Sequence, residues 1–218
     1  MGARERRARE RARRKEQILA AARHLLHTRG IDQTTIVNIA ARVELSAATL
    51  YTYYPGKEAI MAALSSEGVA LLYEAAATAA GEEENPGGQL RRLALAYLEF
   101  SIDHRDYFDM INYFMASLKP VFSENLKVST DMEGEKIIGL VETAIAAGVE
   151  EGCFHVQDPR SAALLFWGAL NGVIQLRKLS GPLLDYRDYR ELYMTTADLL
   201  ILSLSVDNRN PNEQNRSR

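Results

Sequence analysis

The chain has 218 residues, 25% charged and 47% hydrophobic, which is typical of a soluble globular protein with one large or two small domains. Its one cysteine, Cys153, excludes an intrachain disulfide, suits a reducing cytoplasm and is expected to be a buried packing residue. No apolar segment follows Met1, and the longest uncharged run, residues 161–176, is too short to span a bilayer, so we expect a cytoplasmic protein with neither a secretory signal nor a membrane partner.

Charge is distributed unevenly along the chain. The net charge is −3 overall, but residues 1–60 carry +6 and the remaining residues −9. A basic N-terminal part on an acidic body is the layout expected of a protein that contacts DNA with one end only.

Residues 1–15 concentrate the positive charge, with eight Arg or Lys and two Glu. Two interpretations of the basic N-terminal arm, residues 1–13, are open. Either it is disordered in the free protein and its arginines enter the DNA minor groove, or it is a solvated extension of the first helix with no specific role. The first interpretation makes Arg13 and Arg14 candidate DNA contacts, and it predicts that deletion of the arm lowers affinity and flattens its salt dependence.

The first helix is expected over residues 14–29. Its apolar stripe consists of Ile18, Ala21 or Ala22, Leu25 and Leu26. Gly30 is expected to end the helix with a positive φ. His24 and His27 lie on the more polar side without a second group of ligands nearby, so no metal site is predicted.

Two short helices are predicted between residues 34 and 57. An apolar face repeats at helical spacing through Ile36, Ile39, Ala40 and Val43. Either Thr34 or Thr35 can cap this first helix, and Ser46 is a good N-cap for the second. Two helices joined by a three-residue turn form a helix-turn-helix, whose second helix fits the major groove of DNA.

The second of these helices has a surface that suits DNA. Ala47, Ala48 and Thr49 keep its first turn small, so that the backbone can approach base edges. Beyond them, donors suited to phosphate oxygens are supplied by Tyr51, Tyr53 and Lys57. Tyr54 is expected to be a core residue instead. The alternative is that all the tyrosines are core aromatics of a small helical domain.

Residues 18–64 resemble the DNA-binding domain of the TetR (tetracycline-repressor) family of transcriptional regulators. The resemblance rests on the combination of I-L-A-A-A-R-H-L-L-H-T-R-G-I, T-T-I-V-N-I-A and S-A-A-T-L-Y-T-Y-Y-P-G-K-E-A-I. It implies an all-α homodimer with an N-terminal DNA-binding domain and a C-terminal helical bundle that binds an effector. We accordingly expect the DNA-binding domain over residues 14–57, the effector-binding and dimerisation domain over residues 58–206, and a disordered tail over residues 207–218.

The chain departs from the family pattern at two places. Glu44 stands in the turn where the family usually has glycine, and a left-handed residue there costs a non-glycine about 1–2 kcal/mol. Ala47 and Ala48 stand where the family often has lysine and glycine, so base reading is expected to depend on threonine, tyrosine and methyl contacts to thymine. The predicted DNA-contacting residues are Arg13, Arg14, Thr35, Ile36, Asn38, Ser46, Ala47, Ala48, Thr49, Tyr51, Tyr53 and Lys57.

The rest of the chain is helical by pattern. Further helices are expected over residues 57–80, 89–104, 105–118, 124–148, 159–179 and 189–206. Residues 81–88 form the clearest loop, Lys119–Pro120 breaks a helix, and Asp158 can cap the helix that has Pro159 at its first position. In the family, movement of the connector that corresponds to residues 57–80 changes the spacing of the two DNA-reading heads.

The last two helices are the predicted dimer interface. The helix over residues 159–179 is apolar on nearly every face and therefore needs cover on all sides, either from the chain's own core or from a second subunit. The interface residues expected are Leu164, Trp167, Gly168, Gly172, Leu176, Leu192, Leu199 and Leu202.

An effector site in a helical bundle needs large apolar side chains that point inward and a few polar ones. The candidates are Tyr97, Phe100, His104, Phe108, Ile111, Phe114, Trp167, Asn171 and Gln175. Asn171 and Gln175 are polar within an apolar helix, and they can equally pair across a dimer axis. The composition suggests a mainly apolar ligand, and no cofactor is predicted.

The sequence has no phosphate loop, no nucleophile motif of the form Gly-x-Ser-x-Gly, no Cys/His cluster at metal spacing and no cofactor fingerprint, so an enzyme is not predicted. We predict a dimeric repressor that binds a palindromic DNA operator and is released by a small-molecule effector. The alternative is a helical small-molecule-binding or adaptor protein that has lost sequence-specific DNA binding, which Glu44 and the two alanines suggest.

Overall fold

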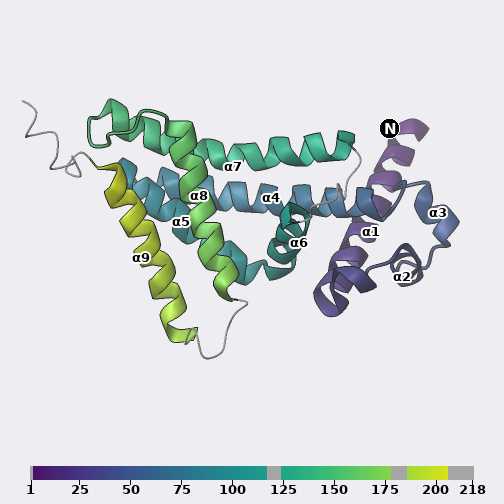
Figure 1. The fold of residues 1–218 in the computed structure, drawn as a ribbon. Coiled ribbons are helices and arrows are strands. Elements are labelled where there is room, and N and C mark those ends of the chain that lie inside the picture. The colour runs from purple at the N-terminus through teal and green to yellow at the C-terminus, as the bar shows by residue number, and fades with distance from the viewer. Residues whose placement is uncertain (1, 117–123, 178–185, 206–218) are drawn as a thin grey trace, which may run out of the picture. The chain divides into compact units, whose positions relative to one another are not determined.

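The computed structural model describes residues 2–116, 124–177 and 186–205, without the side chains of residues 113, 114, 116, 124–133 and 186–188. Figure 1 shows the helices in chain order: α1 (Ala3–Gln33), α2 (Ile36–Arg42), α3 (Ala47–Tyr51), α4 (Lys57–Gly81), α5 (Pro86–Asp103), α6 (Arg105–Ala116), α7 (Glu124–Glu150), α8 (Pro159–Leu176) and α9 (Tyr186–Leu204). Within the described ranges the β-pairing amounts to an isolated bridge between Phe154 and Ser205. The all-α prediction is confirmed.

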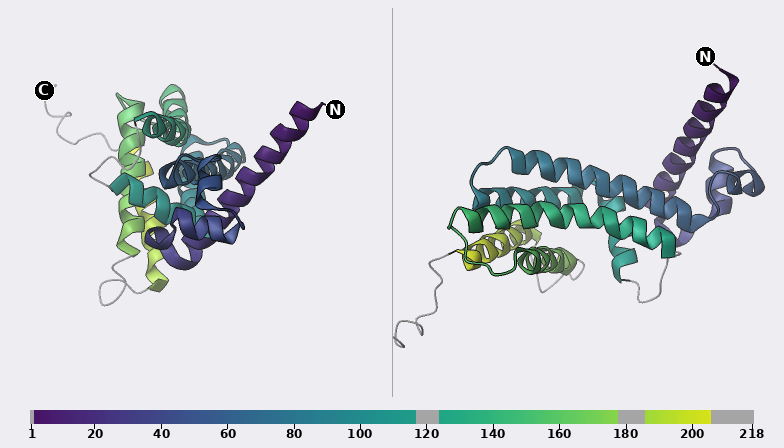
Figure 2. Two further views of the ribbon diagram at one scale, coloured as in Figure 1. Left: turned by 90° about the vertical axis from the view of Figure 1, so that its right-hand side faces the viewer. Right: turned by 90° about the horizontal axis from the view of Figure 1, so that it is seen from above.

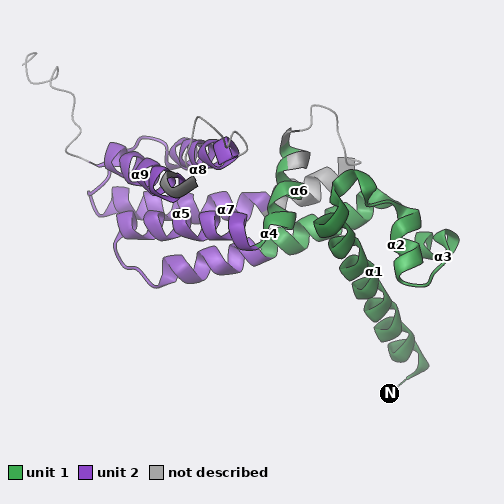
Figure 3. Ribbon diagram, turned by 90° about the horizontal axis from the view of Figure 1, so that it is seen from below, with its two compact units in different colours: residues 1–70, 104–133 green, residues 71–103, 134–218 purple. Residues whose placement is uncertain are grey.

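The chain folds into two compact units (Figure 3). Unit 1 comprises residues 1–70 and 104–133, and unit 2 comprises residues 71–103 and 134–218. Helices α4 and α7 each contribute residues to both units. The division into functional domains near residue 57 stays a prediction, because compactness alone does not locate function.

The core of unit 1 joins α1 to α2, α3 and the first turns of α4. Ile18, Ile39, Leu50, Ile60 and Leu64 are fully buried there. Complete burial of one such side chain contributes about 1.5–3 kcal/mol, so these contacts dominate the packing of a short three-helix group. The predicted apolar stripe of the first helix is buried as expected.

Helix α1 begins at Ala3, not near residue 14 as the sequence pattern suggested. Its first turn is stabilised by the Glu5 carboxylate, which accepts a hydrogen bond from Gly2 N at 3.1 Å. The first turns of α1 extend beyond α2 and α3 in both views of Figure 2. The interpretation of the arm as disordered is therefore wrong, because residues rich in Arg and Ala favour the helix that continues from the packed part of α1.

Unit 2 is a bundle of α5, α8 and α9 with the adjoining parts of α4 and α7. Leu98, Ile145, Leu170 and Tyr193 are buried in it, and the Tyr193 hydroxyl donates to Ala94 O at 2.9 Å. Burial raises the pKa of Tyr193, with the nearby Tyr97 a smaller cause, so this phenol stays protonated and keeps its donor.

Two helix starts in unit 2 follow from capping chemistry. Helix α5 begins at Pro86, three residues before the predicted start, because the Asn85 side chain accepts from Gly88 N at 3.0 Å and proline suits the first helical turn. Helix α8 begins as predicted, with the Asp158 side chain accepting from Arg160 N at 3.1 Å.

The prediction that Cys153 is a buried packing residue is wrong. Its side chain is exposed, and its thiol donates to Gly148 O at 3.3 Å. The packing role belongs to the next residue, Phe154, whose ring lies directly against Gly148. A one-residue shift in a turn reverses which side chain points inward, and composition alone does not reveal it.

Helix α4 is long and apolar enough to cross a membrane by length and composition, but half of its most apolar window is buried within the protein. The core helix of a soluble protein passes the same test, so we assign α4 to the core. The expected break at Lys119–Pro120 and the expected tail over residues 207–218 lie outside the described residues.

Candidate nucleic-acid interface and ligand cavity

The end of α1 provides the support for the helix-turn-helix. Gly30 interrupts the helix with φ 75°, as predicted. Thr34 is fully buried and its hydroxyl donates to Gly30 O at 2.8 Å, while Lys57 Nζ donates to Ile31 O at 2.6 Å. The carbonyl groups that a helix end leaves free are thus satisfied by side chains from both ends of the α2–α3 segment.

Helix α2 is capped by Thr35 and not by Thr34. The Thr35 hydroxyl accepts from Asn38 N at 3.2 Å, and the Asn38 amide group donates to Gln33 O at 2.9 Å. Thr35 and Asn38, both predicted DNA contacts, therefore already form hydrogen bonds with the local backbone. Val37 was not among the predicted DNA contacts, but it is 67% exposed on the same helix and presents its methyl groups to solvent.

The turn between α2 and α3 has the strain that the sequence predicts. Glu44 has φ 56°, the left-handed conformation that favours glycine. Leu45 N donates to Ala40 O at 2.9 Å across this turn, which keeps the connection short. The turn thus keeps its tight form, at a conformational cost of about 1–2 kcal/mol.

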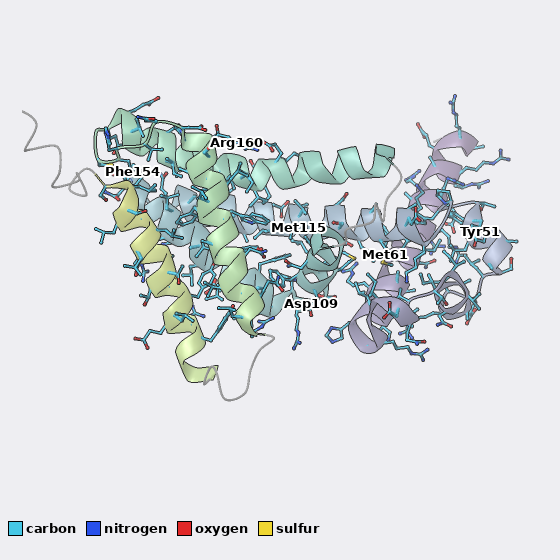
Figure 4. All side chains as sticks on the ribbon, in the orientation of Figure 1. Tyr51, Met61, Asp109, Met115, Phe154 and Arg160 are labelled. Atoms are coloured by element: carbon cyan, nitrogen blue, oxygen red, sulfur yellow. The ribbon has the colours of Figure 1, made fainter. Side chains whose placement is uncertain are left out.

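Helix α3 separates a buried side from an exposed one within five residues. Ser46 Oγ accepts from Thr49 N at 3.1 Å and lies 2.9 Å from Thr49 Oγ1. Leu50 is fully buried, whereas its neighbours Thr49 and Tyr51 are exposed, Tyr51 by 53%. Figure 4 shows Tyr51 on α3. The exposed side carries small residues, Ala48 and Thr49, followed by a phenol.

The residues that follow α3 contact the first helix. Tyr54 is buried, as predicted, and Tyr53 is half-buried. Arg11 donates from Nη2 to Thr52 O at 2.6 Å, and its guanidinium lies 5.2 Å from the Tyr53 ring centre. Lys15 lies 5.1 Å from the ring centre of Tyr54. These cation–π contacts join the N-terminal half of α1 to the end of the recognition helix.

Three of the predicted phosphate contacts differ in how much of their side chain remains available to bind DNA. Arg13 pairs with Glu10 at 2.8 Å, whereas Arg14 is half-buried on another side of α1. Burial lowers the pKa of Lys57, with Asp32 opposing that effect. Because Lys57 also binds Ile31 O, its ammonium has two N–H groups left for a phosphate.

A charged cluster joins α1, α4 and α6 inside unit 1. Arg23 pairs with Glu67 at 3.1 Å, and its guanidinium lies 5.6 Å from the Tyr107 ring centre. A Cβ added at Gly68 would lie 2.9 Å from that ring, so α4 and α6 approach closely only because this residue is glycine. Burial and the adjacent Glu67 carboxylate raise the pKa of Tyr107.

Unit 2 contains a narrow apolar cavity of about 20 Å³. Four helices line it, with the side chains Leu72, Ala76, Leu93, Ala94, Tyr97, Ile137, Val141, Phe166, Trp167 and Leu170. At its edge the Tyr97 hydroxyl donates to Asn171 Oδ1 at 2.9 Å, and the rings of Tyr97 and Trp167 are 6.4 Å apart. Ligand sites are usually several hundred Å³, so this cavity has to widen to admit a ligand.

The predicted effector residues are only partly brought together. Tyr97 and Trp167 line the cavity and Asn171 accepts a hydrogen bond from Tyr97, whereas Phe100 and Gln175 belong to unit 2 without lining the cavity. His104, Phe108 and Ile111 belong to unit 1, and the side chain of Phe114 lies outside the described residues. The aliphatic lining from α4, α5 and α7 was missed, because nothing local distinguishes it from ordinary core.

A larger, open groove of about 500 Å³ lies in unit 1 between the end of α1 and the start of α6. Leu26, Ile31 and Met110 line it beside charged or polar side chains such as His27, Arg105 and Asp109, and none of the predicted effector residues lines it. Since a small-molecule site is usually concave and buries most of its ligand, and since Tyr97 and Trp167 line the cavity of unit 2, we assign the candidate ligand site to that cavity.

Helices α8 and α9 carry a row of exposed leucines. Their exposed fractions are 46% for Leu164, 38% for Leu176, 61% for Leu199 and 57% for Leu202. Gly168 and Gly172 are exposed with open space around them, and Trp167 and Leu192 are half-buried. Several exposed large apolar side chains on neighbouring helices are typical of a protein–protein interface.

An exposed recognition helix on a compact three-helix group, followed by a helical bundle, defines a DNA-binding protein of the helix-turn-helix class. Residues 18–64 match the family described as bacterial regulatory proteins, tetR family, and residues 83–183 match a tetracyclin repressor-like C-terminal domain. The chain belongs to the TetR family of transcriptional regulators, whose members bind DNA and small ligands and are typically not enzymes.

Similar proteins agree with this assignment. Over 89 residues, 40% of this chain, it is 32% identical to the nucleoid occlusion factor SlmA of Pasteurella multocida (strain Pm70), a match that spans 45% of that relative's length. The TetR family regulator PfmR from Thermus thermophilus is 24% identical with a TM-score of 0.65, covering 86% of this chain and 98% of that one. Thermus thermophilus FadR, a repressor in complex with lauroyl-CoA, is 22% identical with a TM-score of 0.66, covering 90% and 97%. These structural likenesses show the shared fold.

Proposed function

We propose that this regulator is a repressor that binds a palindromic operator as a homodimer and is released by a small, mainly apolar effector. The observation that carries the proposal is the polarity of α3, where Leu50 is fully buried while Ala48, Thr49 and Tyr51 are exposed. A helix held in this way can insert its first turn into a major groove without unfolding its own core.

The exposed residues divide into two roles. Ala47, Ala48 and the methyl group of Thr49 offer small apolar contacts to thymine methyl groups, and Val37 extends that surface. Tyr51, Tyr53 and Lys57 donate to phosphates and set the position of α3 on the duplex. Thr35 and Asn38 act in this scheme by holding α2, because both are engaged in local hydrogen bonds.

The exposed leucines of α8 and α9 support dimerisation. Leu164, Leu199 and Leu202 lose their exposure to water if a second copy covers them, and the open glycines Gly168 and Gly172 let a facing helix come close. A two-fold dimer presents two copies of α3, which fit half-sites whose centres are about 34–36 Å apart or slightly more.

The cavity of unit 2 supports an apolar effector. Its lining is aliphatic and aromatic, with the Tyr97–Asn171 pair as the polar element at its edge. A ligand with an apolar chain can widen the cavity, and a polar group can replace one partner of that pair. Because Thermus thermophilus FadR was crystallised with lauroyl-CoA, acyl-CoA compounds are the first class to screen.

The test selects bound duplexes from random DNA and then measures release. We expect an enriched inverted repeat, two chains per duplex by light scattering, and loss of binding on addition of the matching ligand. A monomer that enriches no sequence would instead support the adaptor interpretation. Substitution Asn171→Ala is expected to change the ligand concentration needed for release and not the DNA affinity without ligand.

A further inference from the structure

The N-terminal part of α1 segregates its charges by face. At about 3.6 residues per turn, five cations continue the stripe that is buried further along the helix at Ile18, Ala22 and Leu25. We call this set the basic face, and its residues are Arg4, Arg7, Arg11, Arg14 and Lys15. Glu5 and Glu16 lie on the other side of α1, together with Arg6, Arg9 and Arg13, and Glu10 lies at the edge of the basic face, three residues from Arg7 and four from Arg14.

Contacts with α3 fix the direction of the basic face. Arg11 donates to Thr52 O at 2.6 Å and lies over Tyr53, and Lys15 lies over Tyr54. These contacts attach one end of the basic face to the segment that directly follows the recognition helix. The cations nearer the N-terminus, Arg4 and Arg7, are exposed beyond it, where α1 extends past α2 and α3 (Figure 2).

This arrangement favours an anionic partner. Arginines three and four residues apart repel one another on a helix, and the five cations of the basic face are bordered by one carboxylate, that of Glu10. This carboxylate pairs with Arg13 of the opposite side at 2.8 Å. A surface that gathers five cations with one carboxylate at its edge is typical of proteins that bind a row of phosphates.

A membrane surface is a poor partner for this helix. The apolar residues among positions 3–15 are alanines, whereas a helix that lies in a lipid interface needs large apolar side chains on one face. Duplex DNA needs no apolar insertion, because its phosphate rows bind cations directly.

We propose that the basic face of α1 binds backbone phosphates of the same duplex that α3 reads, as a preformed helical extension of the recognition surface. The inference rests on the proposed DNA-binding function and adds to it a second contact surface. The segment of α1 over residues 3–15 is about 20 Å long, enough to follow several phosphates. Its contribution is independent of sequence, because phosphates carry no base information.

The test compares two double variants that remove the same charge from opposite sides of α1. Arg4→Gln with Arg7→Gln alters the basic face, and Arg6→Gln with Arg9→Gln is the matched control. Arg11 is left intact, since its bond to Thr52 would confound the result. Circular dichroism checks that both variants keep the helix content of the wild-type protein.

Binding is measured at several salt concentrations on two synthetic duplexes, one carrying the sequence that the wild-type protein enriches and one a shuffled sequence of equal length. The basic-face variant is expected to reduce the slope of log K against log salt by about 1.8 per subunit on both duplexes, at about 0.9 for each phosphate that the variant no longer neutralises. The control variant is expected to change the slope much less, and Arg4→Lys with Arg7→Lys to restore it.

Equal slopes for the two Gln variants would overturn the proposal while leaving α3 as the reading element. Failure of the wild-type protein to enrich any sequence would contradict the proposed function instead, and the shuffled duplex would still test the basic face. Binding to anionic lipid vesicles by the wild-type protein but not by the basic-face variant, without any effect on DNA, would assign the surface to membranes and overturn the proposal.

Discussion

The α2–α3 segment and the cavity of unit 2 are both built from helices, but their geometry depends on contacts of different range. The hydrogen bonds that cap α2 and α3 join near neighbours, as in Thr35 with Asn38 and Ser46 with Thr49, and longer-range bonds from Arg11 and Lys57 attach the segment to α1. The cavity is lined from four helices, and its polar pair joins Tyr97 to Asn171, 74 positions away. The form of α2 and α3 is therefore set largely by local bonds, whereas the ligand site can change shape as helices shift.

The largest expected effect is a loss of stability, which tests whether the buried side of α3 faces the core. Leu50→Ala is expected to lower the free energy of unfolding by about 2–5 kcal/mol, because it empties a fully buried site in a small core. Its neighbour provides the control, since Tyr51→Phe should change stability by less than about 0.5 kcal/mol. Urea denaturation measures both, and equal effects would contradict the assigned orientation of α3.

Two glycines of α7 test the packing of unit 2. Gly148→Ala is expected to cost about 1–3 kcal/mol, because the added methyl meets the Phe154 ring. Gly139→Ala in the same helix has open space and should stabilise by about 0.4–1 kcal/mol. Thermal denaturation of both variants gives the comparison, and a shift of the melting temperature in the same direction would show that Phe154 does not pack as described.

Substitutions in the turn before α3 and at its N-cap are expected to change stability in opposite directions. Glu44→Gly is expected to raise stability by up to about 1 kcal/mol, because it relieves the left-handed strain at φ 56°. Ser46→Ala is expected to lower it by about 1 kcal/mol through loss of the N-cap. If removal of Glu44 destabilised the protein, its carboxylate would have a role that the turn geometry does not explain.

The last effect, of similar size, concerns DNA binding by the positioning residues. Tyr53→Phe is expected to weaken binding to all DNA sequences alike, by roughly 0.5–1.5 kcal/mol for one phosphate hydrogen bond. Lys57→Ala should do the same and also lower stability, because it removes the bond to Ile31 O. Anisotropy titrations on matched and shuffled duplexes measure the loss, and a change confined to one base position would contradict the assignment.

The sequence predicted those parts of the fold whose determinants are local. Gly30, the Ser46 cap, the strained Glu44 and the buried Tyr54 follow from backbone preferences and spacing within a few residues. Where tertiary packing decides, the prediction was wrong or incomplete. Phe154 and not Cys153 fills the core. A separate error concerns α1, which starts eleven residues before the expected position because its Arg-rich segment has helix propensity, which the search for an apolar stripe did not detect.

The effector residues show the same limit. Aromatic and polar side chains at helical spacing were predicted from α5, α6 and α8, but of these only Tyr97 and Trp167 line the cavity, with Asn171 bonded to Tyr97. The remainder of the lining is aliphatic and comes from helices distant in sequence, so only the assembled bundle distinguishes it from other core positions.

The most direct measurement of the central claim is a parallel selection from random DNA by the wild-type protein and by Thr49→Ala. We predict that the wild-type protein enriches an inverted repeat and that the variant loses its preference at one base position in each half-site, symmetrically. An identical profile for both proteins, or a selected site without two-fold symmetry, would contradict the account in which paired copies of α3 read the operator.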